Sequence, residues 1–565
     1  MQPNTLYYGD NLSILRDYIP DESVDLIYLD PPFNSNRSYN VLFKDESGHD
    51  SEAQITAFDD TWHWNMETER IYTELVTEGT QRVSSMIGAL RQFIGMNQMG
   101  AYLVMMAARL VELHRVLKPT GSLYLHCDPT ASHYLKIVLD TIFGPENFRN
   151  DITWKRSDTH NDAKNRFSAI SDHLLFYVKT RDYSFFVNRV PHHEGHLTNW
   201  FNNIEMTDGT IRKMTTEELK TGIVPEGARR FSISDLSSPN PRPNLMYSFM
   251  GYPYPAKGWR ITKEKMDLLH KEGRLLFPNK QEGRIVKKKY LDEQEGIVVG
   301  DIWTDITQLR AQDAERLGYP TQKPQALLER IIQASSNPGD LVLDPFCGCG
   351  TAVAAAEALG RRWIGIDITH LAISLIKYRM ETAFPSIKVN VVGEPETISS
   401  ARHLAMTDRY QFQWWALSLI RARPVAETTG KTGKKGADRG IDGVINFIDD
   451  RKGTAKQVIV QVKSGKVQSS HIRDLIGTLD REKSPIGVFL TLEEPSREMV
   501  KEAAGAGFYR SELWNEEYPR VQILTIEQLL NGARVQMPPQ YGTFKGAKRQ
   551  QRDDGSQQLG LLDTE

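Results

Sequence analysis

Cysteine, long apolar runs and an excess of one charge are all scarce in this sequence. Three Cys among 565 residues exclude a scaffold held by disulfides and predict a reducing compartment. No apolar run approaches the roughly 18 residues that a membrane-spanning helix requires. The first residues also lack the basic segment and apolar stretch of a signal peptide. We therefore expect a cytoplasmic protein that makes no contact with a membrane.

The total charge gives no sign of a nucleic-acid partner. The formal net charge is -3, so no basic field surrounds the whole molecule. The length of 565 residues predicts roughly three or four domains, and a local basic surface can be hidden in such a total. Lys and Arg do gather at Arg284–Tyr290 and Gly430–Arg439, although a charge run taken alone usually marks only a solvated face.

What the sequence does contain is an abrupt end to an apolar stretch near its start. Residues 23–29, SVDLIYL, read as a buried strand of a parallel sheet. Directly after them come Asp30, Pro31, Pro32 and Phe33. Because proline has no N–H to continue a strand ladder, Asp30 lies at the carboxyl end of the strand, where open α/β sheets bind ligands. An Asp-Pro step is also a common turn, so this stretch alone leaves both interpretations open.

A second pattern lies far along the chain, at Gly339–Met380. LVLD and RWIGIDI read as strands and TAVAAAEALG as a helix, which together predict a β-α-β unit. In its turn, Gly348 and Gly350 let backbone N–H groups approach a ligand at the positive end of the helix. Asp367 ends the second strand, where an acid can accept ribose hydroxyls. Asp344 precedes the glycines and suits a cationic amino group, such as the methionine end of S-adenosylmethionine, better than a pyrophosphate.

Three motifs, in this order, are similar to those of one enzyme family. D-P-P-F at residues 30–33, GYPTQKPQALLERII at 318–332 and D-P-F-C-G-C-G-T at 344–351 resemble a β-class DNA amino-methyltransferase, and the resemblance extends over residues 1–392. It implies a doubly wound α/β sheet of the Rossmann-like methyltransferase type, S-adenosylmethionine as cofactor and double-stranded DNA as substrate. Asp at the first catalytic position favours N6 of adenine in this family, with N4 of cytosine as the alternative.

The resemblance also implies roles for individual residues. Around the cofactor it assigns a segment near the adenine, a segment that closes over the methionine end, the Gly-rich loop and the ribose-binding acid. In chain order these residues are Asp10, Asn11, Tyr319, Thr321, Gln322, Lys323, Asp344, Phe346, Gly348, Gly350, Thr351 and Asp367. The catalytic residues that it implies are Asp30, Pro31, Pro32 and Phe33.

These catalytic residues suit a base that is flipped out, since a base inside the duplex cannot reach a cofactor pocket. Phe33 offers a stacking face that offsets part of the cost of flipping. Asp30 and the carbonyl of Pro31 can each accept one proton of the exocyclic amine, which frees the nitrogen lone pair to attack the sulfonium methyl. His126 and Asp128 end another predicted strand and are expected at the sheet edge around the target pocket rather than on a metal.

After Val392 the pattern restarts with a second kind of site. GVINFID and QVIVQVK read as the two strands of a hairpin. Asp442 precedes the first strand, and Gln461 and Lys463 lie two apart on the second, so they share a face. Together with EPSREMVKEAAGAGFY further on, this stretch resembles the Mrr-like branch of the PD-(D/E)xK nucleases.

The nuclease resemblance implies Asp442 as a ligand of Mg²⁺ and Lys463 as the residue that orients water or stabilises charge on the phosphate. Gln461 stands where many relatives have an acid, and a neutral ligand weakens a metal site. Gln413 is the nearest candidate for a further ligand. The domain is therefore expected to be either an active restriction endonuclease or a silent DNA clamp.

These patterns divide the chain into successive parts. The expected parts are a catalytic half at 1–154 with a helical insertion at 44–100, a target-recognition region at 155–310, a cofactor-binding half at 311–392, a linker at 393–408, the nuclease-like domain at 409–540 and a disordered tail at 541–565. The combination predicts a restriction–modification or defence role. A homodimer, and methyl transfer to RNA or protein amides instead of DNA, are left as alternatives.

Overall fold

The computed structural model describes most of the chain. The residues described are 4–32, 38–44, 50–59, 63–158, 165, 167–280, 282–310, 312–313, 315–317, 319, 321–425, 440–449 and 455–540, with only the backbone described for 38–44 and 50–59. Phe33, the basic stretch at 431–439 and the predicted tail at 541–565 lie outside these residues. No helix among the described residues is long and apolar enough to cross a membrane.

A large, mostly parallel sheet forms the centre of the first half of the chain. In order across the sheet, its strands in the described residues are β15 (Ile302–Trp303), β6 (Phe148–Lys155), β7 (Ser171–Val178), β5 (Leu117–Cys127), β2 (Val24–Leu29), β16 (Leu341–Asp344), β17 (Arg362–Asp367), β1 (Thr5–Tyr8) and β18 (Asn390–Val392). Only β7 runs antiparallel to its neighbours. The predicted β-α-β unit and the predicted strand before Asp30 are confirmed, and they lie side by side at the centre of the sheet.

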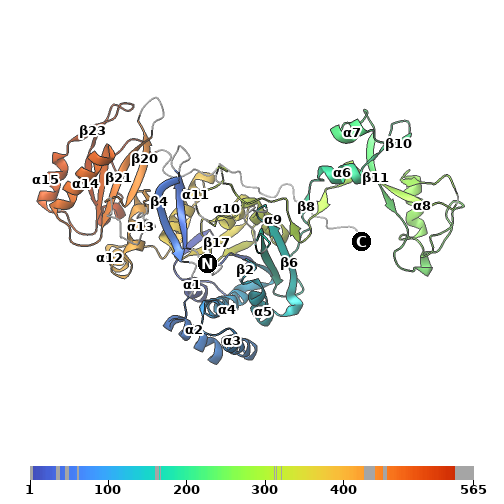
Figure 1. The fold of residues 1–565 in the computed structure, drawn as a ribbon, viewed down its shortest axis with the longest axis horizontal. Helices are drawn as coiled ribbons and strands as arrows, with labels where there is room; N and C mark the ends of the chain where they lie inside the picture. The colour runs from blue at the N-terminus through green and yellow to red at the C-terminus, as the bar shows by residue number, and fades with distance from the viewer. Residues whose placement is uncertain are drawn as a thin grey trace. The chain divides into compact units, whose positions relative to one another are not determined.

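Helices lie on both sides of this sheet (Figure 1). On one side, α1 (Asn11–Tyr18), α4 (Gln98–Val116) and α5 (Ser132–Phe143) share a buried apolar core with β2 and β5. On the other side lie α9 (Gln325–Ser335), α10 (Thr351–Ala358) and α11 (His370–Ala383). This is the doubly wound arrangement expected from the sequence.

Between β2 and α4 the chain adds a hairpin and two helices. The hairpin pairs β3 (Ser38–Lys44) with β4 (Asp50–Asp59). The helices α2 (Met66–Thr77) and α3 (Gln81–Ile94) follow and extend the core below α4 and α5, through Ile71, Val83 and Ile87. The N-terminal ends of both helices are capped, by Asn65 and Thr80.

A separate compact unit comprises Val187–Gly300 and is drawn in green in Figure 1. It contains an antiparallel sheet in the order β10 (Ile211–Lys213), β9 (Asn203–Glu205), β11 (Arg229–Asp235), β13 (Val286–Tyr290) and β12 (Leu275–Leu276). A two-stranded pair, β8 (Arg189–Val190) with β14 (Ile297–Val298), and the helices α6 (Glu194–Trp200), α7 (Thr216–Thr221) and α8 (Lys263–Lys271) complete it. The unit is shorter than the predicted 155–310, because β7 belongs to the large sheet.

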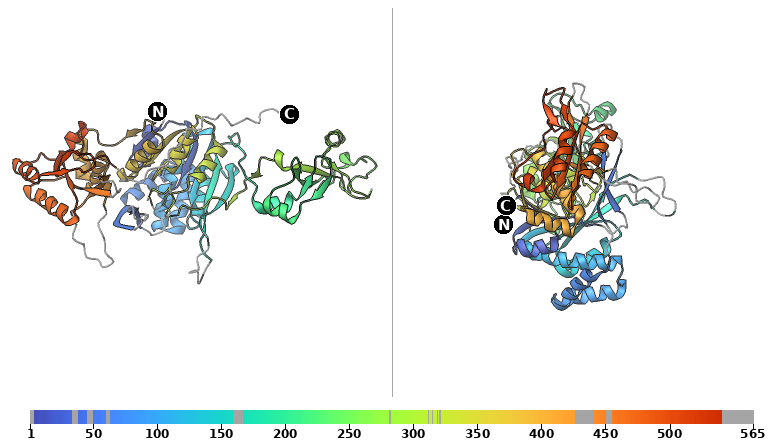
Figure 2. Two further views of the ribbon diagram at one scale, coloured as in Figure 1. Left: turned by 90° about the horizontal axis from the view of Figure 1, so that it is seen from above. Right: turned by 90° about the vertical axis from the view of Figure 1, so that its left-hand side faces the viewer.

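The C-terminal region, drawn in orange to red in Figure 2, forms its own sheet. The strand order is β19 (Arg423–Pro424), β20 (Gly443–Ile448), β21 (Ala455–Lys463), β22 (Ile486–Thr491) and β25 (Val521–Thr525). The predicted hairpin is present, since β20 and β21 pair antiparallel with Gly443 opposite Val460. Around the sheet lie α12 (Ile398–Thr407), α13 (Arg409–Leu419), α14 (Ser469–Glu482), α15 (Arg497–Gly505), α16 (Ile526–Leu530) and the pair β23 (Phe508–Arg510) and β24 (Glu517–Pro519).

Candidate active site

Three acids singled out in the sequence lie at one edge of the large sheet. β2 pairs with β16 and β16 with β17, all in parallel, so their carboxyl ends meet. Asp30, Asp344 and Asp367 consequently line one cavity of about 240 Å³. It is also lined by further residues from the implied site, which are Asp10, Asn11, Pro31, Pro32, Tyr319, Thr321, Gln322, Lys323, Phe346, Gly348 and Thr351.

Two of these acids are held in an environment that disfavours their charge. Burial, together with the neighbouring Asp30 and Asp367, raises the pKa of Asp344 well above its ordinary value. Burial also raises the pKa of Asp367 to about 6, although hydrogen bonds from backbone and side chain oppose the shift. A cationic ligand group beside Asp344 would restore its charge, which is the electrostatic situation that the sequence predicted for an amino group at this turn.

The turn between β16 and α10 brings backbone close to the second acid. The N–H of Gly348 donates to Oδ2 of Asp367 at 3.0 Å, and the N–H and hydroxyl of Thr369 both donate to Oδ1 at 2.9 Å. Gly350 precedes the first residue of α10 with φ +74, and an added Cβ there would lie 2.8 Å from the side chain of Ile376. The turn therefore needs glycine at this position both for its backbone angle and for space.

The early segment at Asp10 and Asn11 is connected to this turn by a side-chain hydrogen bond. Asp10 accepts from the N–H groups of Leu12 and Ser13 and caps α1, and the side-chain amide of Asn11 donates to the carbonyl of Pro345 at 2.8 Å. Arg109, on α4, donates to Asn11 at 2.5 Å and to Asp10 at 2.6 Å. Sequence reasoning missed Arg109, because no local pattern connects a residue of α4 with a loop about a hundred positions earlier.

The segment after Leu317 covers the same cavity. The ring of Tyr319 is buried over Gly348, where an added Cβ would come within 3.2 Å of it. The side chain of Gln322 accepts from the N–H of Leu317 at 2.7 Å and donates to the carbonyl of Glu315 at 2.8 Å, so it braces its own loop. Thr351, by contrast, accepts from the buried guanidinium of Arg379 at 3.2 Å.

Lys323 lies closer to the catalytic motif than the sequence suggested. Its ammonium group forms an ion pair with Oδ2 of Asp30, with both side chains largely buried. The resemblance had assigned Lys323 to the cofactor and Asp30 to the target base. The ion pair instead connects the two parts of the site, and it gives Asp30 a cationic neighbour in the described structure.

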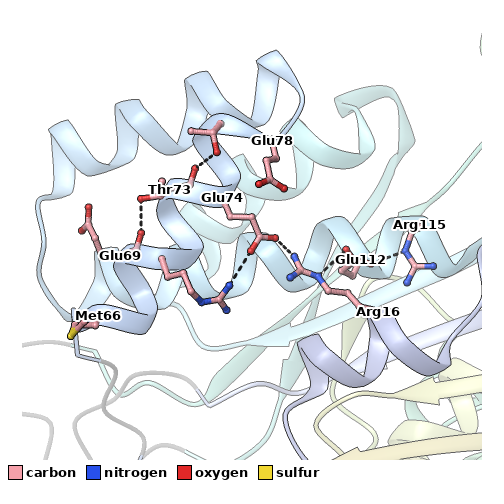
Figure 3. A pocket seen from close by; sticks show the side chains of 10 residues that line it. Arg16, Met66, Glu69, Thr73, Glu74, Glu78, Glu112 and Arg115 are labelled. Atoms are coloured by element: carbon pink, nitrogen blue, oxygen red, sulfur yellow. Dashed lines mark hydrogen bonds and ion pairs between the residues drawn. The ribbon is translucent and has the colours of Figure 1, made fainter.

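A larger, open groove elsewhere is lined by charged side chains that pair with one another. Its lining includes Arg16, Glu74, Glu112 and Arg115, together with residues of α2 (Figure 3). Arg16 pairs with Glu74 and Glu112, and Arg115 pairs with Glu112 at 2.6 Å. These ion pairs join α2 to α1 and α4, so the groove is explained by the attachment of the inserted helices to the core.

In the C-terminal region, the predicted nuclease residues lie together, and Asp442 and Gln461 each form hydrogen bonds within the protein. Asp442 accepts from the side-chain amide of Gln413 at 3.0 Å and from the N–H of Val462 at 2.7 Å. The amide nitrogen of Gln461 donates to the carbonyl of Gly440. Lys463 ends β21 on the face that Gln461 shares.

This arrangement does not fit a resident Mg²⁺. Mg²⁺ prefers several oxygen ligands, usually with one or two carboxylates. The set here has one carboxylate whose two oxygens each accept a protein hydrogen bond, and two neutral amides. Among the described residues, no group of three or more His, Cys, Asp or Glu side chains is arranged to hold a metal ion.

Two family models match separate parts of the chain. A family model described as DNA methylase, N6_N4_Mtase, matches residues 24–378. A second model, described as NACHT-associated inactive Restriction Endonuclease 1, matches residues 428–531. The second match supports a nuclease-like fold in the C-terminal region but not the active Mrr-like nuclease that the sequence suggested.

Several curated methyltransferases are similar to about two thirds of the chain. Type II methyltransferase M.EcaI of Enterobacter cloacae is 28% identical over 380 residues, which cover 67% of this chain and 69% of the relative. DNA adenine methyltransferase YhdJ of Escherichia coli (strain K12) is 24% identical over 383 residues, or 68% of this chain and 84% of the relative. Type II methyltransferase M.BamHI of Bacillus amyloliquefaciens is 26% identical over 377 residues, covering 66% and 56%.

Solved structures resemble the chain more distantly. A DNA modification methylase from Thermus thermophilus, complexed with S-adenosyl-L-methionine, is 16% identical and covers 69% of this chain and 99% of its own, with a TM-score of 0.32.

Proposed function

The chain belongs to the N6/N4 DNA methylase family, and we propose that it transfers a methyl group from S-adenosylmethionine to the exocyclic N6 amine of adenine in double-stranded DNA. The observation that carries this proposal is the single cavity lined by both Asp30 and the turn from Asp344 to Gly348. A reacting amine and a methyl donor must meet within about 3.5 Å, so their binding residues must share one cavity.

The residues around the cavity fit S-adenosylmethionine. Asp344 would accept the amino group of its methionine end and Asp367 its ribose hydroxyls, while Tyr319 and Gly348 would form adjoining walls. Asp10 and Asn11, braced by Arg109, would lie near its adenine. When bound, the cofactor supplies a methyl group made electrophilic by the sulfonium.

The catalytic step rests on two acceptors beside each other. Asp30 and the carbonyl of Pro31 each accept one proton of the target amine, which draws the nitrogen toward tetrahedral geometry and releases its lone pair from the ring. Lys323 pairs with Asp30 in the described structure, so the amine of the flipped base must share or replace that partner. Phe33, the proposed stacking partner of the base, lies outside the described residues.

Adenine is proposed over cytosine because the motif begins with Asp, and the test is direct. Purified full-length protein is incubated with labelled cofactor and unmethylated duplex DNA, single-stranded RNA or a glutamine-containing peptide, and labelled DNA is digested to nucleosides. We expect N6-methyladenine from duplex DNA. Detection of N4-methylcytosine would show that cytosine is the target base. Label in RNA or peptide alone would refute DNA as the substrate.

The unit at Val187–Gly300 is proposed to recognise the target sequence. It carries Arg and Lys on an antiparallel sheet, and such side chains read guanine edges or hold phosphates. Lys287 and Lys289 share one face of β13, and burial, with the positive charge of Arg274 and Lys289, lowers the pKa of Lys287. Accumulated positive charge of this kind attracts a polyanion. A homodimer stays a prediction that a sedimentation measurement would test.

For the C-terminal region we favour a DNA-binding role without cleavage over an active endonuclease. The supporting observation is that both carboxylate oxygens of Asp442 accept hydrogen bonds, from Gln413 and from the N–H of Val462, and that the amide nitrogen of Gln461 donates to the carbonyl of Gly440. Cleavage assays with Mg²⁺ and Mn²⁺ on unmethylated and methylated DNA test this choice. Cutting that disappears in Lys463→Ala, with methyl transfer preserved, would restore the endonuclease prediction.

A further inference from the structure

A buried arginine holds together two parts of the cavity wall. Arg109 lies on α4, is 3% exposed and lines the cavity. Its Nε donates to Oδ1 of Asn11 at 2.5 Å, and its Nη2 donates to Oδ2 of Asp10 at 2.6 Å. Because the guanidinium is planar and presents its donors as a rigid fork, it fixes the two side chains at the start of α1 relative to each other.

These bonds determine the orientation of the Asn11 amide. An arginine only donates and a backbone carbonyl only accepts, so Oδ1 of Asn11 faces Arg109. Its Nδ2 donates to the carbonyl of Pro345 at 2.8 Å. Pro345 directly follows Asp344, and the amide therefore connects the start of α1 to the turn between β16 and α10. This orientation does not depend on the charge of any neighbouring acid.

Asp10 is fixed in a similar way but remains accessible. Its Oδ1 accepts from the N–H groups of Leu12 and Ser13, and its Oδ2 accepts from Arg109. A carboxylate has about four lone-pair sites, so these three bonds leave capacity for a further donor. The side chain of Asp10 is 42% exposed and lines the cavity. A ligand in the cavity can thus reach an acceptor whose position is already set.

Stability alone does not explain a cation at this place. Burial lowers the pKa of Arg109, although the charge of Asp10 opposes that shift. Well-packed apolar side chains often replace a buried ion pair without loss of stability. Arg115, on the same helix, shows the structural alternative. It donates to the carbonyls of Leu15 at 2.6 Å and Ile19 at 3.1 Å, so it attaches α4 to α1 without lining the cavity.

We propose that Arg109 is a positioning residue for the adenine end of the cofactor, and that it acts through Asp10 and Asn11. This inference rests on the proposed use of S-adenosylmethionine. Side chains that are held in place before the ligand arrives need not be ordered when it binds, which increases affinity. Arg109 contacts neither the reacting amine nor the methyl group in this proposal. Its loss should therefore weaken cofactor binding and leave the chemical step unchanged.

The test compares Arg109→Lys with Arg115→Lys in the full-length protein. Both changes keep the positive charge and remove a guanidinium that connects α4 to α1, so their general cost is matched. A lysine has one ammonium and cannot reproduce the fork. We expect Arg109→Lys to raise the dissociation constant of S-adenosylmethionine about tenfold in calorimetry, with kcat on duplex DNA preserved at saturating cofactor. Arg115→Lys should keep the wild-type affinity.

A second ligand separates the two ends of the cofactor site. 5′-Methylthioadenosine carries the adenine and ribose but lacks the amino and carboxylate groups of the methionine end. Its affinity is measured by displacement of labelled S-adenosylmethionine. Arg109→Lys should weaken both ligands by the same factor, whereas Asp344→Asn should weaken mainly S-adenosylmethionine. A loss in Arg109→Lys that is confined to S-adenosylmethionine, or a wild type that does not bind the second ligand, would overturn the assignment to the adenine end.

Thermal unfolding of each variant separates weak binding from loss of the fold. If Arg109→Lys does not fold, Arg109→Met takes its place, because an apolar side chain fills the buried space and the exposed Asp10 can be solvated. Asn11→Ala should also weaken binding, and its combination with the Arg109 variant should bind no more weakly than the weaker of the two single variants, since both act through one contact. Additive losses would refute a role of Arg109 through Asn11.

The failures are distinguishable. Wild-type protein that does not bind S-adenosylmethionine refutes the proposed function and this inference together. If the wild type binds the cofactor, unchanged affinity in the folded Arg109 variant, or an equal loss in Arg115→Lys, refutes only the role of Arg109. A loss of kcat at saturating cofactor with unchanged affinity would likewise remove Arg109 from the adenine end.

Discussion

The pKa of Asp367 makes the affinity for the proposed cofactor depend on pH. Burial raises this pKa to about 6 in the structure without ligand. In the proposed complex a ribose hydroxyl donates to the carboxylate, so binding and protonation of Asp367 compete. For a group with this pKa, the ionised fraction falls about tenfold between pH 7 and pH 5. Asp367 alone should therefore raise the apparent dissociation constant of S-adenosylmethionine about tenfold over that interval, or about 1.4 kcal/mol.

Isothermal titration calorimetry checks both the affinity and the proton. In two buffers of different ionisation enthalpy, binding should release about 0.9 proton from Asp367 at pH 5 and about 0.1 at pH 7. Asp367→Asn cannot titrate, so it should bind more weakly at pH 7 and lack this step. Proton release from Asp344 would persist in that variant, lowered by the loss of the neighbouring Asp367 charge. Asp17→Asn, on an exposed part of α1, serves as the control.

Two results would refute this reasoning. One is an affinity that stays the same between pH 5 and pH 7. The other is a pH dependence of equal size in Asp367→Asn, since the titrating group would then lie elsewhere. In addition, normal affinity of Asp367→Asn for S-adenosylmethionine at pH 7 would show that Asp367 does not bind the ribose.

Asp30→Ala should lower methyl transfer at least about 100-fold, the scale of a lost proton acceptor, with cofactor affinity preserved in calorimetry; lost affinity would contradict its assignment to the target amine. Lys323→Met leaves Asp30 without its ionic partner, so kcat should fall more than cofactor affinity. A larger loss of cofactor affinity than of kcat would instead indicate that Lys323 binds the cofactor. Gly350→Ala should lower the free energy of unfolding more than Gly339→Ala, whose φ is also positive but whose added Cβ has open space; equal losses would show that backbone angle alone matters.

The central part of the fold could be predicted because its signals are local. An apolar stretch that ends in Asp30 and two prolines, and a β-α-β unit with glycines in its turn, are readable within about 40 residues. The resemblance to the methyltransferase family then indicated that these two distant patterns belong to one site. The parallel pairing of β2 with β16 then follows, since their carboxyl ends must share one edge to form a site.

The contacts that tune the site could not be read in the same way. Lys323 and Asp30 are separated by 293 positions, and Arg109 reaches Asp10 across 99. Such pairs depend on how helices and strands pack, which single-residue patterns do not encode. His126 was expected at the sheet edge, but its two partners come from other strands and only the assembled sheet shows that it joins them.

The last prediction concerns Asp442 in the C-terminal region. The motif implies that it is a Mg²⁺ ligand, whereas in the structure its carboxylate accepts hydrogen bonds from the protein. Asp442 accepts hydrogen bonds from Gln413 and from the N–H of Val462, so it acts as a junction between α13, β20 and β21. Asp442→Ala leaves both donors without that acceptor, which costs about 1–3 kcal/mol in a partly buried place. Amide hydrogen exchange in β20 and β21 should accelerate accordingly, and the exposed Asp474→Ala should leave it unchanged.

Titration with Mg²⁺ decides between this junction and a metal ligand. Anything that binds the folded state alone raises its stability by mass action, so a resident Mg²⁺ would raise the melting temperature of the wild-type domain. A junction made of hydrogen bonds predicts no such rise in wild type or in Asp442→Ala. A Mg²⁺-dependent rise that Asp442→Ala abolishes would overturn the junction, and would make Gln461→Glu, which adds a charged ligand, the next variant to test for cleavage.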